Sequence, residues 1–211
     1  MRIIIVRHGE TNWNREGRVM GLSDLELNEN GKNQAELMAQ SLSRGNVASI
    51  YTSPLKRALE TAHIINRFHQ VKITTLDGLR ELDAGEVDGL TYHEIQKYYG
   101  DFFERWMNNC AVVRPPGGCT VLDVQNQAWA AMQEIIRREK ARLQENEGKA
   151  IIVVSHFFPI RAILCKAMNL DLSQIRRIRL DLASISILDF NDDGIELTQM
   201  NDVCHWKEGQ P

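Results

Sequence analysis

The chain has 211 residues, of which 43% are hydrophobic and 25% are charged, with a formal net charge of -3. That size and composition are typical of one globular domain, and the scattered charges lack the basic run that nucleic-acid binding would need. No apolar run approaches the roughly 18 residues of a membrane span, and the apolar run at the start of the sequence is shorter than the core of a signal peptide. The four cysteines show neither close pairing nor metal-ligand spacing, which favours a reduced, cytoplasmic protein without a membrane partner.

The N-terminal half alternates short apolar runs with helical patterns. Strands are predicted over residues 2–6, 48–52 and 72–76. A helix is predicted over 29–43 with Asn28 as its N-cap, and a second is expected to open with Ser53 as cap and Pro54 as first residue and to run to about 68. Residues 77–90 form a glycine-punctuated loop, whose acidic side chains we interpret as solvated and not as a metal site.

The C-terminal half continues the alternation. In chain order it predicts an aromatic helical section over 92–107, a long helix from a Thr120–Asp123 capping box to near 148, a strand over 150–154, a helix opened by Pro159, and a hairpin from 184–190 and 195–200. Strands that alternate with helices indicate a parallel sheet covered on both faces. We therefore expect an α/β fold: a three-layer sandwich with a mostly parallel central sheet flanked by helices, a terminal antiparallel hairpin and a small helical cap at about 90–118, within one domain over 1–211.

Two histidines stand at the exits of predicted buried strands. His8 follows the first strand directly after Arg7, and His156 follows the strand over 150–154. Because ligands bind at the carboxyl ends of parallel strands, the two imidazoles are expected to meet. The guanidinium fork of Arg7 suits phosphate oxygens, and a histidine in a positive environment can attack phosphorus.

Three more side chains are expected at the same place. Arg57 lies in the first turn of its helix, near the positive end of the helix dipole. Asn14 can donate a hydrogen bond from the loop after the first strand. Glu81, in the loop after the third strand, is a candidate general acid.

Taken in order, these segments resemble the phosphoglycerate-mutase-like branch of the histidine phosphatase superfamily. The similar segments are 6–11 (VRHGET), 52–58 (TSPLKRA), 79–81 (LRE), 154–156 (VSH) and 201–205 (NDVCH). The similarity extends over the whole chain. It implies a metal-independent phosphatase that needs no cofactor and hydrolyses a small-molecule phosphomonoester through a phosphohistidine.

The resemblance also implies a role for each candidate residue. His8 would attack phosphorus, and Glu81 would protonate the leaving oxygen and then activate water. The phosphoryl oxygens would be bound by Arg7, Asn14, Arg57 and His156. Donors aimed at the equatorial oxygens stabilise the charge of the transition state, so no metal is required.

Several positions on the substrate side depart from the family pattern. Phe157 and Phe158 follow the second histidine where small residues are common, which makes the pocket more apolar and places Phe157 among the candidate substrate contacts. The other departures are Met20, Val87, Asp88, Cys119 and Thr120. We expect retained chemistry with an altered specificity, toward leaving groups of apolar or ring character.

Two other functions remain open. A cofactor-dependent phosphoglycerate mutase uses the same phosphohistidine, but mutases of the family have a longer cap with more basic residues than Lys97, Arg105 and Arg114. A non-catalytic phospho-ligand binding module would not need the complete set of candidate residues. His205 is interpreted as a terminal packing residue, with a contact to the pocket as the alternative. The oligomeric state is left open, with a homodimer as one possibility.

Overall fold

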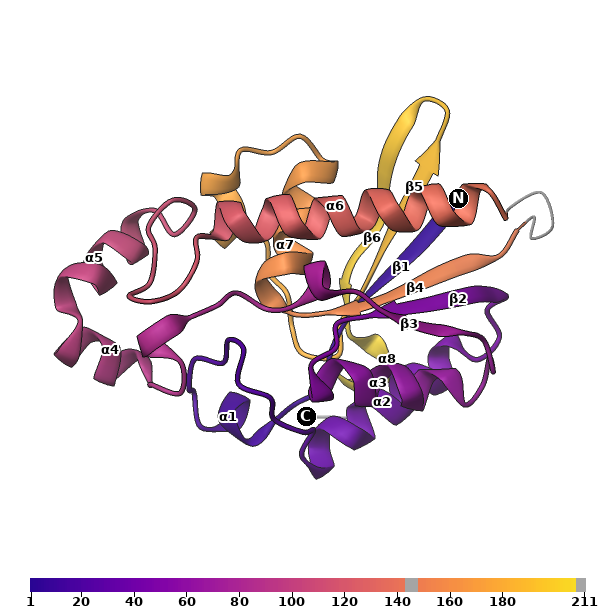
Figure 1. Cartoon of the computed structure of the whole chain (residues 1–211). Helices are drawn as coiled ribbons and strands as arrows, with labels where there is room; N and C mark the ends of the chain where they lie inside the picture. Colours follow the sequence, from indigo (N-terminus) through magenta and orange to yellow (C-terminus); the bar gives the residue numbers. More distant parts are fainter. Residues whose placement is uncertain (143–147, 208–211) are drawn as a thin grey trace.

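The computed structural model describes residues 1–142 and 148–207, which form the expected three-layer α/β fold (Figure 1). The described strands make a six-stranded sheet in the order β3-β2-β4-β1-β5-β6. They are β1 (Arg2–Arg7), β2 (Val47–Thr52), β3 (Ile73–Thr75), β4 (Ala150–Ser155), β5 (Ile185–Asn191) and β6 (Gly194–Asp202). The first four strands pair in parallel, and β5 runs antiparallel to both β1 and β6. The predicted mostly parallel sheet with a terminal hairpin is confirmed.

Helices cover both faces of the sheet, as Figure 1 shows. One face carries α6 (Val121–Lys140) and α7 (Phe157–Ala167), and the other carries α2 (Glu29–Leu42) and α3 (Lys56–Asn66). In β1, Ile3 and Ile5 belong to the core under α6 and α7, whereas Ile4 and Val6 belong to the core over α2 and α3. Successive side chains of a strand point to opposite faces, so an unbroken apolar strand supplies both cores.

The remaining elements are short and border the carboxyl ends of the strands. The cap consists of α4 (Tyr92–Tyr98) and α5 (Gly100–Asn108), which stand beyond the end where α6 begins (Figure 1). The others are α1 (Asn12–Arg15), α8 (Cys204–Lys207) and the 3-10 helices η1 (Asp77–Leu79), η2 (Gly85–Val87) and η4 (Leu172–Arg177). Among the described residues, no helix combines the length and hydropathy needed to cross a bilayer.

Two predicted helix starts are wrong by a few residues. α3 begins at Lys56 with Leu55 as its N-cap, because the Ser53 hydroxyl accepts the Leu55 N–H (3.3 Å) within the preceding turn. α7 begins two residues before Pro159, with His156 as its N-cap. Pro159 is thus the third helical residue, still within the first turn, where an N–H has no intrahelical partner to lose.

Two other helix boundaries also differ from the prediction. The expected single section over 92–107 is two helices, separated at Tyr99, whose φ of -133° and ψ of 43° are not helical. The long helix has the predicted Thr120–Asp123 capping box but ends at Lys140, not near 148. The stretch 143–147 of that prediction lies outside the described residues.

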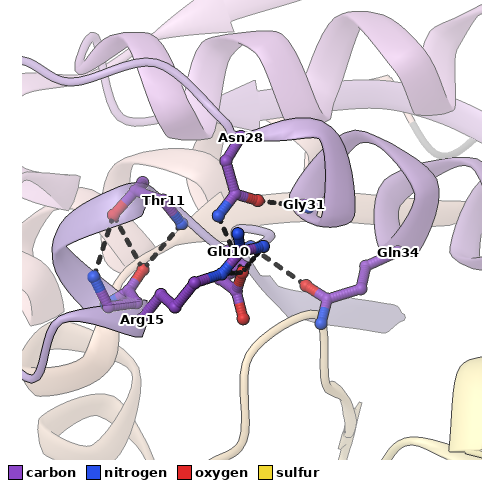
Figure 2. A network of polar contacts seen from close by, with 7 residues as sticks. Glu10, Thr11, Arg15, Asn28, Gly31 and Gln34 are labelled. Carbon is purple, nitrogen blue, oxygen red and sulfur yellow. Dashed lines mark hydrogen bonds and ion pairs between the residues drawn. The ribbon is translucent and has the colours of Figure 1, made fainter.

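The loop after β1 is tied to the start of α2 by a polar network (Figure 2). Glu10 accepts hydrogen bonds from the Asn28 amide (2.7 Å) and from the Arg15 guanidinium (2.8 Å), and its own N–H donates to Gln34 (2.9 Å). Asn28 also accepts the Gly31 N–H at 2.8 Å as the predicted N-cap. The network fixes the loop that follows His8.

Gly31 is the close-packed point of this junction. A Cβ atom at Gly31 would lie 2.0 Å from the backbone oxygen of Glu10, and this contact involves two rigid backbones. We expect Gly31→Ala to lower the free energy of unfolding by about 1–3 kcal/mol, the usual cost of overpacking. Urea denaturation checks this, with Gly100→Ala as a matched control, because a Cβ at the helical Gly100 meets no atom within 4 Å. Equal stability of the two variants would contradict the prediction.

Candidate active site

The register of two central strands brings His8 and His156 together. β1 and β4 pair in parallel with Arg7 opposite Ser155, so the next residue of each strand leaves the sheet at the same point. The His8 N–H donates to the backbone oxygen of Ser155 (3.2 Å), and the two imidazole centroids lie 5.0 Å apart. Both side chains are buried. The expected meeting of the two histidines is confirmed.

One hydrogen bond determines which nitrogen of His8 can react. The Nδ1 atom lies 2.7 Å from the backbone oxygen of Gly9. A carbonyl oxygen can only accept, so Nδ1 carries the proton and Nε2 keeps its lone pair. Burial, with Arg57 and Arg7 nearby, holds the pKa of His8 well below its usual value, which keeps the imidazole neutral at physiological pH.

Two arginines beside the histidines are held by backbone carbonyls. Arg57 is fully buried, and its Nη1 and Nη2 atoms donate to the backbone oxygens of Ser23 and Gly21, both at 2.8 Å. Arg7 donates from Nη1 to the backbone oxygen of Leu180 (2.7 Å). Burial lowers the pKa of Arg7 to about 10, so this guanidinium remains charged at neutral pH. Neutral partners position both arginines without cancelling their charge.

Several buried nitrogens in this group have no hydrogen-bond partner within the described part of the chain. They are both ring nitrogens of His156 and the Nε atoms of Arg7 and Arg57. Buried polar atoms are nearly always hydrogen-bonded, so such a concentration of unpartnered nitrogens indicates a site that is completed by a ligand. We refer to Arg7, His8, Arg57 and His156 as the His8 cluster.

Glu81 lies against the start of α7, where it meets the His8 cluster. Its Oε2 accepts the Phe157 N–H (2.9 Å), and its Oε1 accepts the N–H groups of Leu82 (2.8 Å) and Phe158 (3.1 Å). Burial raises the pKa of Glu81, although the N–H donors and the two arginines oppose that shift. The carboxyl group therefore keeps its proton to a higher pH than an exposed glutamate does.

Asn14 was predicted as a phosphate ligand and His205 as a packing residue, and the two side chains have different surroundings in the structure. Asn14 lines the pocket, and its amide oxygen accepts the Thr11 N–H (3.0 Å) within a capping box, which leaves its NH₂ group as the potential donor. Nε2 of His205 lies 2.9 Å from the backbone oxygen of Ala183. Since a carbonyl accepts, Nε2 of His205 is the donor, and the packing interpretation of this residue fits its position.

The His8 cluster opens into a pocket of about 220 Å³ beneath the cap. Its floor includes Arg7, His8 and Glu81. Its walls are mainly apolar and come from the loop after α1, the segment that includes η2, the cap, the loop before α6 and the start of α7: Val19, Met20, Leu82, Ala84, Val87, Tyr92, Ile95, Phe102, Phe103, Trp106, Pro115, Phe157 and Phe158. The pocket thus combines a polar floor with a largely aromatic upper part.

The aromatic residues of the cap do not all behave as predicted. Phe102 and Trp106 are buried and line the pocket, as expected for the inner face of a cap helix. Tyr92 also lines the pocket but is 60% exposed, and Tyr98 is 61% exposed. Both tyrosines belong to α4, in which the buried side chain is that of Ile95.

The acidic loop is structural in part. Asp88 accepts the N–H groups of Gly21 (2.8 Å) and Ser23 (3.1 Å), the same two residues whose carbonyls hold Arg57. Asp88 therefore anchors the loop that positions Arg57. Within residues 1–142 and 148–207, no group of three or more His, Cys, Asp or Glu side chains is arranged to hold a metal ion.

Two arginines at this site were not identified from the sequence. Arg18 lines the pocket and is paired with Glu16 (2.8 Å) and Glu94 (3.4 Å). Arg161 is buried in α7 with its guanidinium 4.4 Å from the centroid of the Phe157 ring. A charged residue inside the otherwise apolar run over residues 157–165 is the signal that would have pointed to Arg161.

Comparisons with known proteins identify the family of this chain. The family model of the histidine phosphatase superfamily (branch 1) matches residues 3–203. Phosphoserine phosphatase 1 of Hydrogenobacter thermophilus is 34% identical over 208 residues, which are 99% of this chain and 95% of the relative. The structure of Bacillus stearothermophilus YhfR superposes with a TM-score of 0.87 at 28% identity over 97% of this chain and 98% of that one.

A phosphoserine phosphatase variant from Entamoeba histolytica, solved with phosphoserine, has a TM-score of 0.79 at 27% identity, over 97% of this chain and 98% of that one. The chain belongs to the histidine phosphatase superfamily, branch 1. It is a phosphoric monoester hydrolase of that family, so the predicted small-molecule phosphatase class is confirmed.

Proposed function

We propose that the chain hydrolyses small phosphomonoesters without a metal ion, through a phosphohistidine formed at Nε2 of His8. The observation that carries this proposal is the set of unpartnered nitrogens around the His8 ring, on Arg7, Arg57 and His156. A phosphoryl group offers oxygens to all of these donors at once. Its negative charge would also offset the burial of two guanidinium groups.

His8 is the nucleophile in this proposal. Its lowered pKa keeps Nε2 unprotonated, and the hydrogen bond from Nδ1 to Gly9 fixes the ring orientation before substrate arrives. As the phosphoryl group moves from the ester oxygen to Nε2, Nδ1 remains protonated and shares the developing positive charge with the Gly9 carbonyl. The bond formed is N–P and the bond broken is P–O.

Arg7, Arg57, His156 and Asn14 are the proposed ligands of the phosphoryl oxygens. The carbonyls of Gly21, Ser23 and Leu180 hold the two guanidinium groups in place before reaction. Donors that are oriented in advance stabilise the charge of the transition state without reorganising. In this arrangement the chain's own cations do the work that a metal ion does in other phosphatases.

Glu81 is the proposed general acid and base. Its raised pKa favours a proton that can be given to the leaving alkoxide, and the resulting carboxylate can then take a proton from the water that hydrolyses the phosphohistidine. The N–H groups of Leu82, Phe157 and Phe158 stabilise the carboxylate after that transfer. One residue thus serves both halves of the reaction.

The pocket walls support an apolar leaving group. Phosphoserine, named for two of the relatives, carries an ammonium and a carboxylate on the leaving alcohol. Above the floor of the described pocket, Arg18 is the charged side chain, and it is already paired with Glu16 and Glu94. The aromatic rings of Trp106, Phe103 and Phe158 favour a ring or branched hydrocarbon at this position.

The test compares two alkyl esters in excess chelator, 2-phenylethyl phosphate and glycerol 1-phosphate. Both leave as alkoxides, so the comparison measures binding of the leaving group and not its acidity. We expect kcat/KM to be about 10- to 100-fold higher for the phenylethyl ester, as burial of an aromatic side group predicts. Phosphate release without metal supports the proposed chemistry. A kcat/KM for glycerol 1-phosphate or phosphoserine equal to that for 2-phenylethyl phosphate would overturn the leaving-group proposal.

A phosphoglycerate mutase is the second candidate, and the cap weighs against it. Lys97, Arg105 and Arg114 are not among the described residues that line the pocket. Arg114 instead donates to the Asp123 carboxylate at 2.9 Å. Transfer of phosphate to 3-phosphoglycerate, in place of release to water, would favour the mutase.

The proposal also includes the cellular setting. Cys110, Cys119 and Cys165 are free thiols, which is typical of cytosolic proteins, and we propose a cytoplasmic location on this basis. The partner we propose is a small phosphomonoester, and a homodimer stays a prediction.

A further inference from the structure

One aromatic ring at the edge of the site contacts two guanidinium groups. The Cζ atom of Arg7 lies 4.8 Å from the centroid of the Phe157 ring, and the Cζ atom of Arg161 lies 4.4 Å from the same centroid. Both distances are within the range of cation–π attraction. The ring thus attracts two cations that repel each other, and the charge of Arg161 lowers the pKa of Arg7.

The contact with the Phe157 ring adds to the hydrogen bond by which the Leu180 carbonyl holds Arg7. Of its guanidinium nitrogens, Nη1 is held by Leu180, and Nε has no partner among the described residues. A hydrogen bond at one nitrogen fixes a point but leaves the plane of the group free to tilt. The Phe157 ring, whose centroid lies 4.8 Å from Cζ of Arg7, limits that tilt, and two-point binding of phosphate oxygens depends on the plane of the guanidinium group.

Arg161 restrains the ring from outside the pocket. Its Nη2 donates to the backbone oxygen of Ile175, and Arg161 is not among the residues that line the pocket. Its described contact with the site is the Phe157 ring. An effect of Arg161 on phosphate binding would therefore pass through that ring or through its long-range charge.

The backbone and the side chain of Phe157 have separate contacts. Its N–H donates to Glu81, whereas its ring contacts Arg7. A substitution that removes only the ring leaves the N–H to Glu81 in place, so the two contacts can be tested independently.

We infer that Phe157 is a positioning residue, which holds the Arg7 guanidinium in the plane that binds phosphate and is itself held by Arg161. The inference rests on the proposed role of Arg7 as a phosphate ligand. It assigns the bulky residue after the second histidine to the phosphate side of the site, in addition to the pocket wall.

The probe is inorganic phosphate, which has no leaving group to contact the ring. Calorimetric binding of phosphate to Phe157→Leu should be about tenfold weaker than to the wild-type protein, as loss of a buried cation–π contact predicts. Phe157→Tyr keeps an aromatic face and should restore affinity to within about twofold. The matched control is Tyr98→Leu, which removes the exposed Lys97–Tyr98 contact outside the pocket and should leave phosphate affinity unchanged.

Arg161→Met separates positioning from direct contact. It should weaken phosphate binding about threefold, and the double variant with Phe157→Leu should be no weaker than Phe157→Leu alone, because the ring transmits the effect. In turnover, KM should rise for both alkyl esters in Phe157→Leu, with a smaller change in kcat.

Unchanged phosphate affinity in Phe157→Leu, with a raised KM for 2-phenylethyl phosphate alone, would make the ring a leaving-group contact and overturn the inference. Additive effects in the double variant would also overturn it. If Phe157→Leu is unfolded by circular dichroism, the comparison of Arg161→Met and Phe157→Tyr with the wild type decides the question. A wild-type protein that binds phosphate but does not turn over esters would refute the proposed function while this binding test still applies.

Discussion

Replacement of His8 by alanine is expected to lower kcat/KM for a phosphomonoester by about 10⁴- to 10⁶-fold, the usual cost of losing a covalent nucleophile. The reason is that Nε2 of His8 is an unprotonated ring nitrogen, which the Nδ1–Gly9 hydrogen bond orients beside the two arginines of the His8 cluster. Phosphate release in excess chelator measures the effect. Rapid quenching of the wild-type reaction in alkali, with a radiolabelled ester as substrate, should also trap a phosphoenzyme that is stable to alkali. No phosphoenzyme should be trapped with His8→Ala.

The control for this experiment is His63→Ala. His63 is an exposed histidine of α3, and its substitution should leave kcat/KM unchanged. Thermal unfolding of His8→Ala confirms that the variant is folded. A folded His8→Ala protein with more than about a hundredth of the wild-type activity would refute a phosphohistidine at this residue.

Glu81→Gln should separate the two halves of the reaction. With an alkyl ester, which needs a proton on its leaving oxygen, we expect turnover to fall by about 10²- to 10⁴-fold. With p-nitrophenyl phosphate, whose leaving group needs little protonation, we expect a burst of one nitrophenolate per enzyme and then slow turnover, because the phosphohistidine lacks the base that activates water. Stopped-flow absorbance measures both phases.

The pH dependence gives a second measurement of the same residue. The raised pKa of Glu81 means that its proton is lost at a higher pH than that of an ordinary glutamate, so kcat/KM for an alkyl ester should fall as pH rises through that pKa. The lowered pKa of His8 puts protonation of the nucleophile, and with it the acidic limb of the profile, well below neutral pH. In Glu81→Gln the basic limb should disappear.

Glutamine cannot accept all three N–H groups that hold Glu81, so Glu81→Ala is the companion variant. Both should show the burst with p-nitrophenyl phosphate, because neither removes His8. Equal losses of the burst and of steady turnover in both variants would indicate that Glu81 positions the start of α7 and is not the acid.

Much of the fold followed from local sequence patterns. Unbroken apolar runs such as residues 150–154 predicted central strands, because a strand buried on both faces needs apolar side chains at every position. The capping residues Asn28, Thr120 and Asp123 correctly marked the starts of two helices. Pro54 and Pro159 misled, because proline is tolerated throughout the first turn and in the turn before a helix, so it marks a helix start only to within a few residues.

The sequence by itself determined the identities of the proposed reacting groups and their place in the fold. Arg7 and His8 leave one parallel strand and His156 leaves its neighbour, and the carboxyl ends of parallel strands meet at one edge of a sheet. Tertiary structure alone decided how these groups are tuned. The tautomer of His8 depends on the Gly9 carbonyl, and the orientation of Arg57 depends on the carbonyls of the loop after α1.

The contact of Phe157 with Arg7 and the raised pKa of Glu81 likewise arise from residues far apart in the chain, whereas Arg161 lies one helical turn after Phe157 in α7. Backbone carbonyls and N–H groups are the same in every residue, so no pattern of side chains reports which of them will face a given group. Burial, which shifts the pKa values of His8 and Glu81 in opposite directions, is a property of the packed chain. The sequence therefore determines which chemistry is present, and the packed structure determines the protonation states and orientations in which it operates.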